Sequence, residues 1–336
     1  MLDYKSPPRA SASQPRALVR VLVNQQSALA ILLIAEIVVF SIIGTHFFSR
    51  DNAFEIVRVS VEVGLLAVAL TPVIITGGID LSVGSLMALC AVCFGMLWRD
   101  AHFPILLAIA VALLIGALAG ALNGLLITRL RIPALIVTLG SFSLFRGLAE
   151  GLTGGVQNYT NFPNRFLFLG QGYFAGGIPA QLPVFVLVTI AFWWMLHRTA
   201  TGRALFAIGF SPEGARYAGI RVERRLSLVY ILCGLVSSLA GIIYVAHMGQ
   251  AKANAGTGYE LLAITAVVLG GTSIFGGRGS VHGSVLGLFA ISVLKTGLQL
   301  ADLPAELAGI LTGVLLLAAL IANQLLARFF AGVSQQ

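Results

Sequence analysis

Continuous runs of Leu, Ala, Ile and Val, each about the length of a membrane span, recur along the whole chain and are separated by charged residues or by clusters of Gly and Pro. A bilayer core about 30 Å thick needs about 20 apolar residues in a helix, and the alternating pattern of a membrane β-barrel is absent from the sequence. The pattern predicts an all-α fold, a polytopic helical membrane protein with about ten transmembrane helices. The expected spans cover residues 28–48, 57–77, 83–98, 105–127, 133–154, 181–196, 226–248, 259–275, 281–300 and 306–327.

The composition supports the membrane assignment and excludes a soluble globule. Of 336 residues, 58% are hydrophobic and 10% are charged, with a mean hydropathy of +0.94, which leaves too little polar surface to cover a water-soluble protein of this size. The net charge of +8 comes from Lys and Arg residues that punctuate the apolar runs, so it indicates cytoplasmic loops rather than nucleic-acid binding. Their distribution predicts two cytoplasmic tails, residues 1–27 and 328–336, around a membrane domain over residues 28–327.

Motifs for catalysis, or for binding a nucleotide or a metal, are missing from the sequence. The three lysines, Lys5, Lys252 and Lys295, follow Tyr, Ala and Leu, so the chain contains no P-loop. It has no zinc-protease or serine-hydrolase motif, and its cysteines lie in apolar stretches without a second pair at metal-ligand spacing. We expect a transport protein and not an enzyme, with no catalytic residue, cofactor or metal of its own.

A polar, glycine-rich stretch over residues 77–85 separates two of the expected spans. Its glycines can end one helix in a left-handed turn, and Asp80 or Ser82 can cap the next helix. One interpretation is a tight helical hairpin at the cytoplasmic border. The other is a break that exposes backbone groups and an acid beside a water-filled path, where irregular backbone is tolerated in membranes. The sequence leaves both interpretations open.

Other polar side chains lie inside the expected spans. Glu36 lies in the first span and is expected to face the bundle interior or water, either in an interhelical hydrogen bond or against substrate. Asn123 lies beside three glycines, spaced four residues apart, which favour close packing of helices. These glycines are Gly116, Gly120 and Gly124. Arg146 and Glu150 lie one helical turn apart, where an ion pair would lower the cost of burying either residue.

The long basic stretch over residues 197–225 is expected to be a cytoplasmic loop that contains one short helix. After Ser211, Pro212 suits the first helical position, and the acidic residue that follows suits the positive end of the helix dipole. The helix is expected to run to about Ala218 and to stop at Gly219. Aromatic residues among the charges favour docking onto a partner, and a solvated loop that only sets the membrane orientation is the alternative.

The glycine-rich stretch 77–85, the basic stretch 197–225 and residues 266–281 (AVVLGGTSIFGGRGSV) resemble parts of the permeases of ribose-type monosaccharide ABC importers. The similarity covers about residues 30–325. The resemblance implies a bacterial inner-membrane subunit that moves a small-molecule sugar and is surrounded by membrane lipid. The implied partners are a separate ABC ATPase subunit, which binds and hydrolyses ATP, a periplasmic sugar-binding protein, and a second permease copy or a paralogue. The resemblance implies no nucleic-acid partner.

Three further stretches, residues 35–40, 196–199 and 297–304, are most similar to the rhamnose and autoinducer-2 branch of that family. Rhamnose is the preferred substrate on this similarity. The first alternative is autoinducer-2 or another pentose or hexose, and the next is a branched-chain amino acid in a related ABC permease. The last is a proton-coupled secondary transporter in which Glu36 and Asp80 carry protons.

The resemblance places ATPase coupling in the helix over residues 211–219, with two further residues ahead of it. The expected coupling residues are Gly202, Arg203, Ser211, Pro212, Glu213, Gly214, Ala215, Arg216, Tyr217, Ala218 and Gly219. The resemblance does not identify the residues that touch sugar. The candidates for the substrate path therefore rest on polarity alone, and they are Glu36, Asp80, Ser82 and Asn123.

Overall fold

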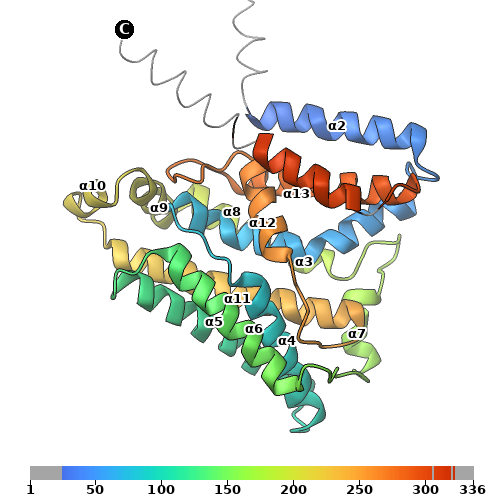
Figure 1. Ribbon diagram of the computed structural model, residues 1–336, viewed down its shortest axis with the longest axis horizontal. Coiled ribbons are helices and arrows are strands. Elements are labelled where there is room, and N and C mark those ends of the chain that lie inside the picture. The colour runs from blue at the N-terminus through green and yellow to red at the C-terminus, as the bar shows by residue number, and fades with distance from the viewer. Residues whose placement is uncertain (1–24, 305, 319–320, 322–336) are drawn as a thin grey trace, which may run out of the picture.

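The computed structural model describes residues 25–304, 306–318 and 321, and in these residues regular structure is helical, with two isolated β-bridges (Figure 1). The expected tail 328–336, and all but the end of the expected tail 1–27, lie outside the described residues. The helices are α2 (Gln25–Ile43), α3 (Arg50–Ile75), α4 (Val83–Arg99), α5 (Ile105–Thr128), α6 (Ala134–Thr153), α7 (Asn164–Gln171), α8 (Leu182–Arg198), α9 (Ala200–Phe210), α10 (Pro212–Tyr217), α11 (Val222–Met248), α12 (Tyr259–Leu269) and α13 (Val281–Leu300), followed by a helix over Glu306–Ala318.

Each expected span overlaps a helix, but not every helix has the length of a membrane crossing. Within the described residues, six helices are long and apolar enough to cross a membrane, namely α2, α3, α5, α6, α11 and α13. Helices α8 and α9 would form a seventh span as a pair bent by 70°, whereas α4, α12 and the helix over Glu306–Ala318 are shorter. The all-helical polytopic fold agrees with the prediction, although the described residues contain six or seven such spans where about ten were expected.

Helix α3 forms the centre of the molecule. In its most apolar window 89% of the residues are buried inside the protein, and the helix packs against α8, α11, α12 and α13. Leu65, Leu66 and Leu70 of α3 are completely buried. Because lipid tails are as apolar as leucine, burying these side chains gains little from the hydrophobic effect, and close packing holds the helices together instead.

The contact between α5 and α11 shows how this close packing is achieved. A Cβ atom on Gly116 would lie 2.5 Å from the carbonyl oxygen of Gly234, and one on Gly120 would lie 2.2 Å from the carbonyl oxygen of Tyr230. Only glycine allows the two backbones to approach this closely. The sequence prediction that this glycine face packs against another helix is confirmed.

The helices lie in two groups on either side of α3 (Figure 1). Helices α2 and α13 lie together on one side, and α4, α5, α6 and α11 lie on the other. The short helix α10 lies at one end of the molecule, which we call the α10 end, and α7 lies at the opposite end. The arginine-rich α10 end is the end for which the positive-inside rule predicts a cytoplasmic position. On the outward faces of α5 and α6, Leu118 and Ile136 are exposed, as is usual for helices surrounded by lipid or by another apolar subunit.

Candidate functional site

The basic stretch over residues 197–225, in which the sequence predicts one short helix, contains two, α9 and α10. Helix α9 follows α8 after a bend of 70°, and Thr199 caps it by accepting a hydrogen bond from the Gly202 N–H at 3.3 Å. A Cβ atom on Gly202 would lie 1.8 Å from the Leu196 carbonyl oxygen, so glycine permits the sharp bend. The expectation of a loop over residues 200–210 is wrong, because α9 turns an apolar face that includes Ile208 into the core.

Helix α10 begins and ends where the sequence predicts. Ser211 caps it, because the Ser211 hydroxyl oxygen accepts a hydrogen bond from the Gly214 N–H at 3.0 Å. Pro212 occupies the first turn, where a missing N–H costs no hydrogen bond. Gly219 follows the helix at φ +80°, a left-handed conformation that glycine adopts without the strain of other residues. The predicted short helix is therefore confirmed in its position and its caps.

One side of α10 is anchored to its neighbours. Ala215 is buried in a small apolar cluster with Ile208 of α9 and Val222 of α11. Arg216 forms an ion pair with Glu223 of α11, with 3.0 Å between Nη2 and Oε1. These contacts hold the short helix at a defined angle, although an isolated helix of six residues would not be stable in water.

The other side of α10 is exposed, and an aromatic side chain lies at each of its ends, because Phe210 is the last residue of α9 and Tyr217 is the last residue of α10. Phe210 is 87% exposed and Tyr217 is 93% exposed, at the end of the molecule where α10 stands apart from the long helices (Figure 1). Exposed aromatic residues rimmed by charges mark an interaction surface. We call residues 210–219 the coupling surface, after the coupling role that the sequence resemblance implies for this helix. Of the other two predicted coupling residues, Gly202 is buried in the first turn of α9, and Arg203 is exposed on the same helix.

Helix α9 connects the coupling surface to the end of α3 and to the loop before α13. A Cβ atom on Gly209 would lie 1.8 Å from the Ile75 carbonyl oxygen and 2.5 Å from the Gly277 nitrogen. Gly277 donates its N–H to the same Ile75 oxygen at 2.8 Å, and Gly276 lies against Gly209 and Gly77. The end of α3, the end of α9 and the loop before α13 therefore meet in backbone contact. We call these five residues the glycine junction.

Three of the four candidate path residues form one buried hydrogen-bond network. Asp80 Oδ1 accepts from the Ser82 N–H at 2.9 Å and from the Ser82 hydroxyl at 2.6 Å. Asn123 of α5 donates its Nδ2–H to Ser82 Oγ at 3.0 Å and accepts from the Ser141 hydroxyl of α6. The four side chains are buried. In this conformation the network holds the chain break before α4 against α5 and α6, and its side chains do not face water.

Glu36, the fourth candidate, lies apart from this network on α2, which packs against α13. It is 8% exposed, and among the described residues its Oε2 atom has no hydrogen-bond partner. The interhelical hydrogen bond expected for Glu36 is therefore not formed by this oxygen. A buried carboxyl oxygen without a partner is costly, so Glu36 occupies an unfavourable position in this arrangement.

Sequence reasoning missed a second polar site, which lies between the middle of α3 and the end of α11. Glu62 Oε1 lies 2.7 Å from His247 Nδ1, and the two side chains are 2% and 8% exposed. The rings of Tyr244 and Tyr259 meet edge to face with their centroids 6.5 Å apart. An acidic residue inside an expected span was the available signal, because such a residue needs a partner.

Arg146 ties α6 to the loop before α12 and does not pair with Glu150. Its guanidinium donates to the carbonyl oxygens of Ala253 and Ala255, the latter at 3.1 Å. The ion pairs of the described residues do not include one between Arg146 and Glu150, so this prediction is wrong. Glu150 is exposed, so its carboxylate is not buried and does not need the guanidinium as a partner.

Comparison with protein families identifies the class to which this fold belongs. The family model described as "Branched-chain amino acid transport system / permease component" matches residues 52–320, a range that includes the glycine junction and the coupling surface. The chain belongs to this family, and its apolar helices make it a multi-pass protein of the bacterial inner membrane. It is a transport subunit of the ABC permease type, as the sequence resemblance implied.

Individual relatives narrow the assignment further. The autoinducer 2 import system permease protein LsrD of Photorhabdus luminescens is 38% identical over 309 residues, which cover 88% of this chain and 90% of the relative. LsrD of Escherichia coli strain K12 is 36% identical over 314 residues, which cover 90% of this chain and 92% of the relative. These relatives support the autoinducer-2 alternative better than rhamnose, the substrate preferred from the sequence. No solved structure matches the chain.

Proposed function

We propose that this chain is the permease subunit of an ABC importer that carries autoinducer-2, rather than rhamnose, across the bacterial inner membrane. The observation that carries the proposal is the 36–38% identity to autoinducer-2 import permeases over 88–90% of this chain. The proposed partners are an ABC ATPase subunit, a periplasmic binding protein that delivers the substrate, and a second permease copy or a paralogue.

A branched-chain amino acid, which the family description names, is the second candidate substrate. A zwitterion needs a cation and an anion, or helix termini, placed together in its path. The polar groups gathered at the break before α4 are one acid, two hydroxyls and an amide, from Asp80, Ser82, Ser141 and Asn123. The set contains an acid but no basic side chain, so the N-terminus of α4 would have to bind the carboxylate of a zwitterion. Every member of the set can hydrogen-bond the hydroxyl groups of a neutral molecule.

The coupling surface is the proposed contact for the ATPase subunit. Phe210 and Tyr217 would insert into that partner as aromatic anchors, while the ion pair between Arg216 and Glu223 keeps α10 oriented. ATP is proposed to bind and react in the partner, whose closure would push α10. Because Gly209 contacts the end of α3 and the loop before α13 through backbone atoms, little flexible side chain lies between the push and the membrane helices.

The buried network is the proposed part of the path that opens. In the closed arrangement Asp80, Ser82 and Asn123 satisfy one another. When the central helix α3 tilts, hydroxyl groups of the substrate would replace these hydrogen bonds, so that no buried polar group is left without a partner. Glu36 on α2 lies apart from this network, and of the four candidates it is the one with the least support for a role in the substrate path.

Reconstitution tests this function. The chain, its ATPase, the second permease subunit and the binding protein are placed in sealed vesicles, and uptake of autoinducer-2, rhamnose and leucine is compared. We expect ATP-dependent accumulation of autoinducer-2 that persists when the proton gradient is collapsed and ATP is maintained. Faster uptake of rhamnose or leucine would overturn the proposed substrate. Loss of uptake on collapse of the gradient would overturn the ABC mechanism in favour of proton-coupled transport.

A further inference from the structure

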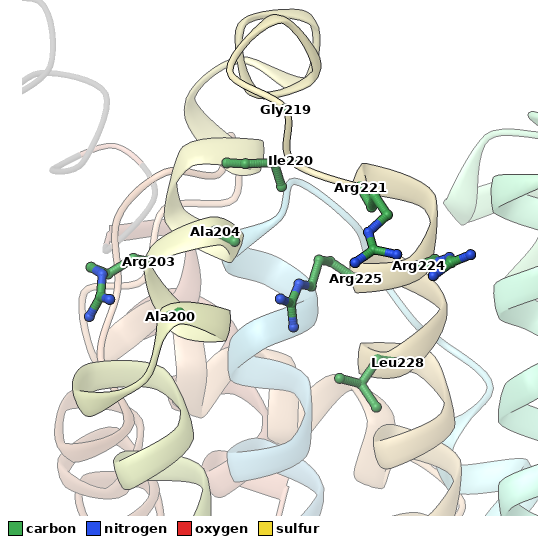
Figure 2. Close-up of a pocket in the computed structure, with 9 residues that line it drawn as sticks. All are labelled: Ala200, Arg203, Ala204, Gly219, Ile220, Arg221, Arg224, Arg225 and Leu228. Carbon is green, nitrogen blue, oxygen red and sulfur yellow. The ribbon is translucent and has the colours of Figure 1, made fainter.

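A basic pocket of about 690 Å³ lies between α9 and the start of α11, at the α10 end (Figure 2). Four of the residues that line it are arginines, and the others are apolar or glycine. Figure 2 shows Arg221 and Arg225 between the two helices, Arg203 at the rim on α9, and Arg224 turned towards the other side of α11. The lining of this pocket contains no acidic side chain.

The arginines of α11 oppose one another and the dipole of their own helix. Arg221 is the N-cap residue of α11, and Arg224 and Arg225 follow three and four residues later. Like charges at this spacing destabilise a helix, and the first turn is the positive end of the helix dipole. Arg225 donates to the Thr201 hydroxyl at 2.7 Å, while Glu223 is already engaged in an ion pair with α10. An anion in the pocket would offset both unfavourable terms.

The shape and depth of the pocket indicate which kind of anion it suits. The pocket runs from Gly219, beside α10, to Leu228 on α11 (Figure 2). Leu228 lies six residues beyond Val222, which at 1.5 Å per residue is about 9 Å along a helix long enough to cross the membrane. The pocket therefore joins a basic opening at the start of α11 to an apolar floor, formed by Leu228, further along that helix. The positive-inside rule explains basic residues at this end, but not an apolar floor beneath them.

We propose that this pocket binds the phosphate of an anionic phospholipid from the cytoplasmic leaflet. The guanidinium groups of Arg221 and Arg225 contact the phosphate oxygens, and Leu228 contacts the first part of an acyl chain. Guanidinium groups bind phosphate oxygens in pairs, and basic pockets between membrane helices on the cytoplasmic side suit such headgroups. The bound lipid holds α9 against α11 beneath the coupling surface. This inference does not depend on the transported substrate.

Lipid binding to the full chain tests the proposal. The purified protein is placed in nanodiscs that contain phosphatidylcholine with or without phosphatidylglycerol, and the retained lipids are counted by native mass spectrometry. We expect wild type to retain phosphatidylglycerol selectively. The double variant Arg221→Gln/Arg225→Gln should bind phosphatidylglycerol roughly tenfold more weakly or worse, because each basic residue near the membrane surface contributes to binding an anionic lipid, and its phosphatidylcholine binding should not change.

Two matched variants separate the pocket from general effects of charge and folding. Arg129→Gln/Arg131→Gln removes the same charge from an adjoining groove, which shares Arg221, Arg224 and Leu228 with the pocket but lies on the other side of α11 from Arg225, and should keep the preference. Thr201→Val removes the hydrogen bond of Arg225 but not its charge, and should also keep it. Equal losses in both double variants would show that the effect is only net charge, and would overturn the proposal.

The remaining arms identify other occupants. If wild type retains no phosphatidylglycerol selectively but binds inorganic phosphate at millimolar concentration, a free anion is the ligand and the lipid proposal is wrong. If Arg221→Gln/Arg225→Gln loses the ATPase on co-purification but keeps the preference for phosphatidylglycerol, the pocket binds an acidic surface of that subunit, which also overturns the proposal. An unchanged lipid preference in this variant has the same consequence.

Discussion

Gly209 and Phe210 are neighbours in the chain, yet they belong to two regions that are built in opposite ways. Gly209 lies in the glycine junction, where even a single added carbon atom would collide with the backbone of α3. Phe210 lies on the coupling surface and is 87% exposed. The junction therefore depends on close packing within the protein, whereas the coupling surface depends on what it leaves uncovered. Substitutions should damage the first through folding and packing, and the second through association alone.

The largest effect is expected at the glycine junction. In Gly209→Ala the new Cβ atom would lie 1.8 Å from the Ile75 carbonyl oxygen, and backbone atoms cannot rotate away as a side chain can. The end of α9 must therefore move away from α3. This shift should lower the free energy of unfolding by at least the roughly 1–3 kcal/mol that is typical of overpacking. We expect a lower Tm and a loss of more than about tenfold in ATP-driven uptake.

Gly140→Ala on α6 is the matched control for this substitution. A Cβ atom on Gly140 meets no heavy atom within 4 Å among the described residues, and alanine is the better helix former by roughly 1 kcal/mol. Tm and uptake should stay at or above the wild-type values. A Gly209→Ala protein that transports as well as Gly140→Ala would show that the junction transmits no motion.

The second effect is expected on the coupling surface and leaves the fold intact. Phe210→Ala/Tyr217→Ala removes two side chains that are 87% and 93% exposed. The free energy of unfolding should therefore change by no more than about 0.5 kcal/mol, and Tm should stay close to that of wild type. Aromatic anchors in an interface are worth about 2 kcal/mol or more each. We expect affinity for the ATPase subunit to fall by about a thousandfold if the two anchors add, and by at least the roughly thirtyfold that one anchor supplies, measured by binding to the purified permease.

Phe48→Ala provides the control, because Phe48 is 84% exposed but lies at the far end of α2 from the coupling surface. It should not alter ATPase affinity. Full recovery of the ATPase by Phe210→Ala/Tyr217→Ala would mean that α10 is a solvated loop element without a docking role, as the alternative interpretation of the sequence has it.

A third, smaller effect on stability is expected in the buried network around Asn123. This network is enclosed, as the junction is, but its groups are polar. Asn123→Ala removes the donor to Ser82 and the acceptor of Ser141, which leaves buried hydroxyl groups short of a partner at about 1–3 kcal/mol. Thermal unfolding should show a lower Tm. Ser41→Ala, at an exposed hydroxyl that bonds only within its own helix, should be nearly neutral. Equal Tm values for the two variants would contradict the network.

Sequence reasoning predicted the coupling surface far better than the glycine junction, and distance along the chain is the reason. The cap at Ser211, the proline after it and Gly219 lie within nine residues of one another, so local rules locate α10. The junction joins Gly77, Gly209 and Gly276, which come together only when the tertiary fold forms. Their backbone contacts have no local signature, although each glycine is visible in the sequence.

The same reason separates the polar residues that were found from those that were missed. Asp80 and Ser82 are only two residues apart and form a hydrogen bond with each other, and the glycine-rich sequence around them is a local signal of a helix break. Glu62 and His247 are 185 residues apart, and neither lies in a recognisable motif. Helix α9 was also missed, because the basic residues at the bend, His197 and Arg198, indicate a loop, whereas the Thr199 cap begins a new helix directly after them.

The smallest effect is expected at Gly219, where glycine serves the coupling surface in a different way from Gly209. A Cβ atom on Gly219 meets no heavy atom within 4 Å among the described residues, so the cost of Gly219→Ala is only the left-handed conformation at φ +80°, about 1–2 kcal/mol for an ordinary residue. Asparagine tolerates this conformation better, so Gly219→Asn should recover part of the loss in Tm. At Gly209, by contrast, asparagine should be worse than alanine, because space and not backbone conformation is limiting there. The same order of alanine and asparagine at both positions, in thermal unfolding of the four variants, would erase the distinction between a packed junction and an exposed surface.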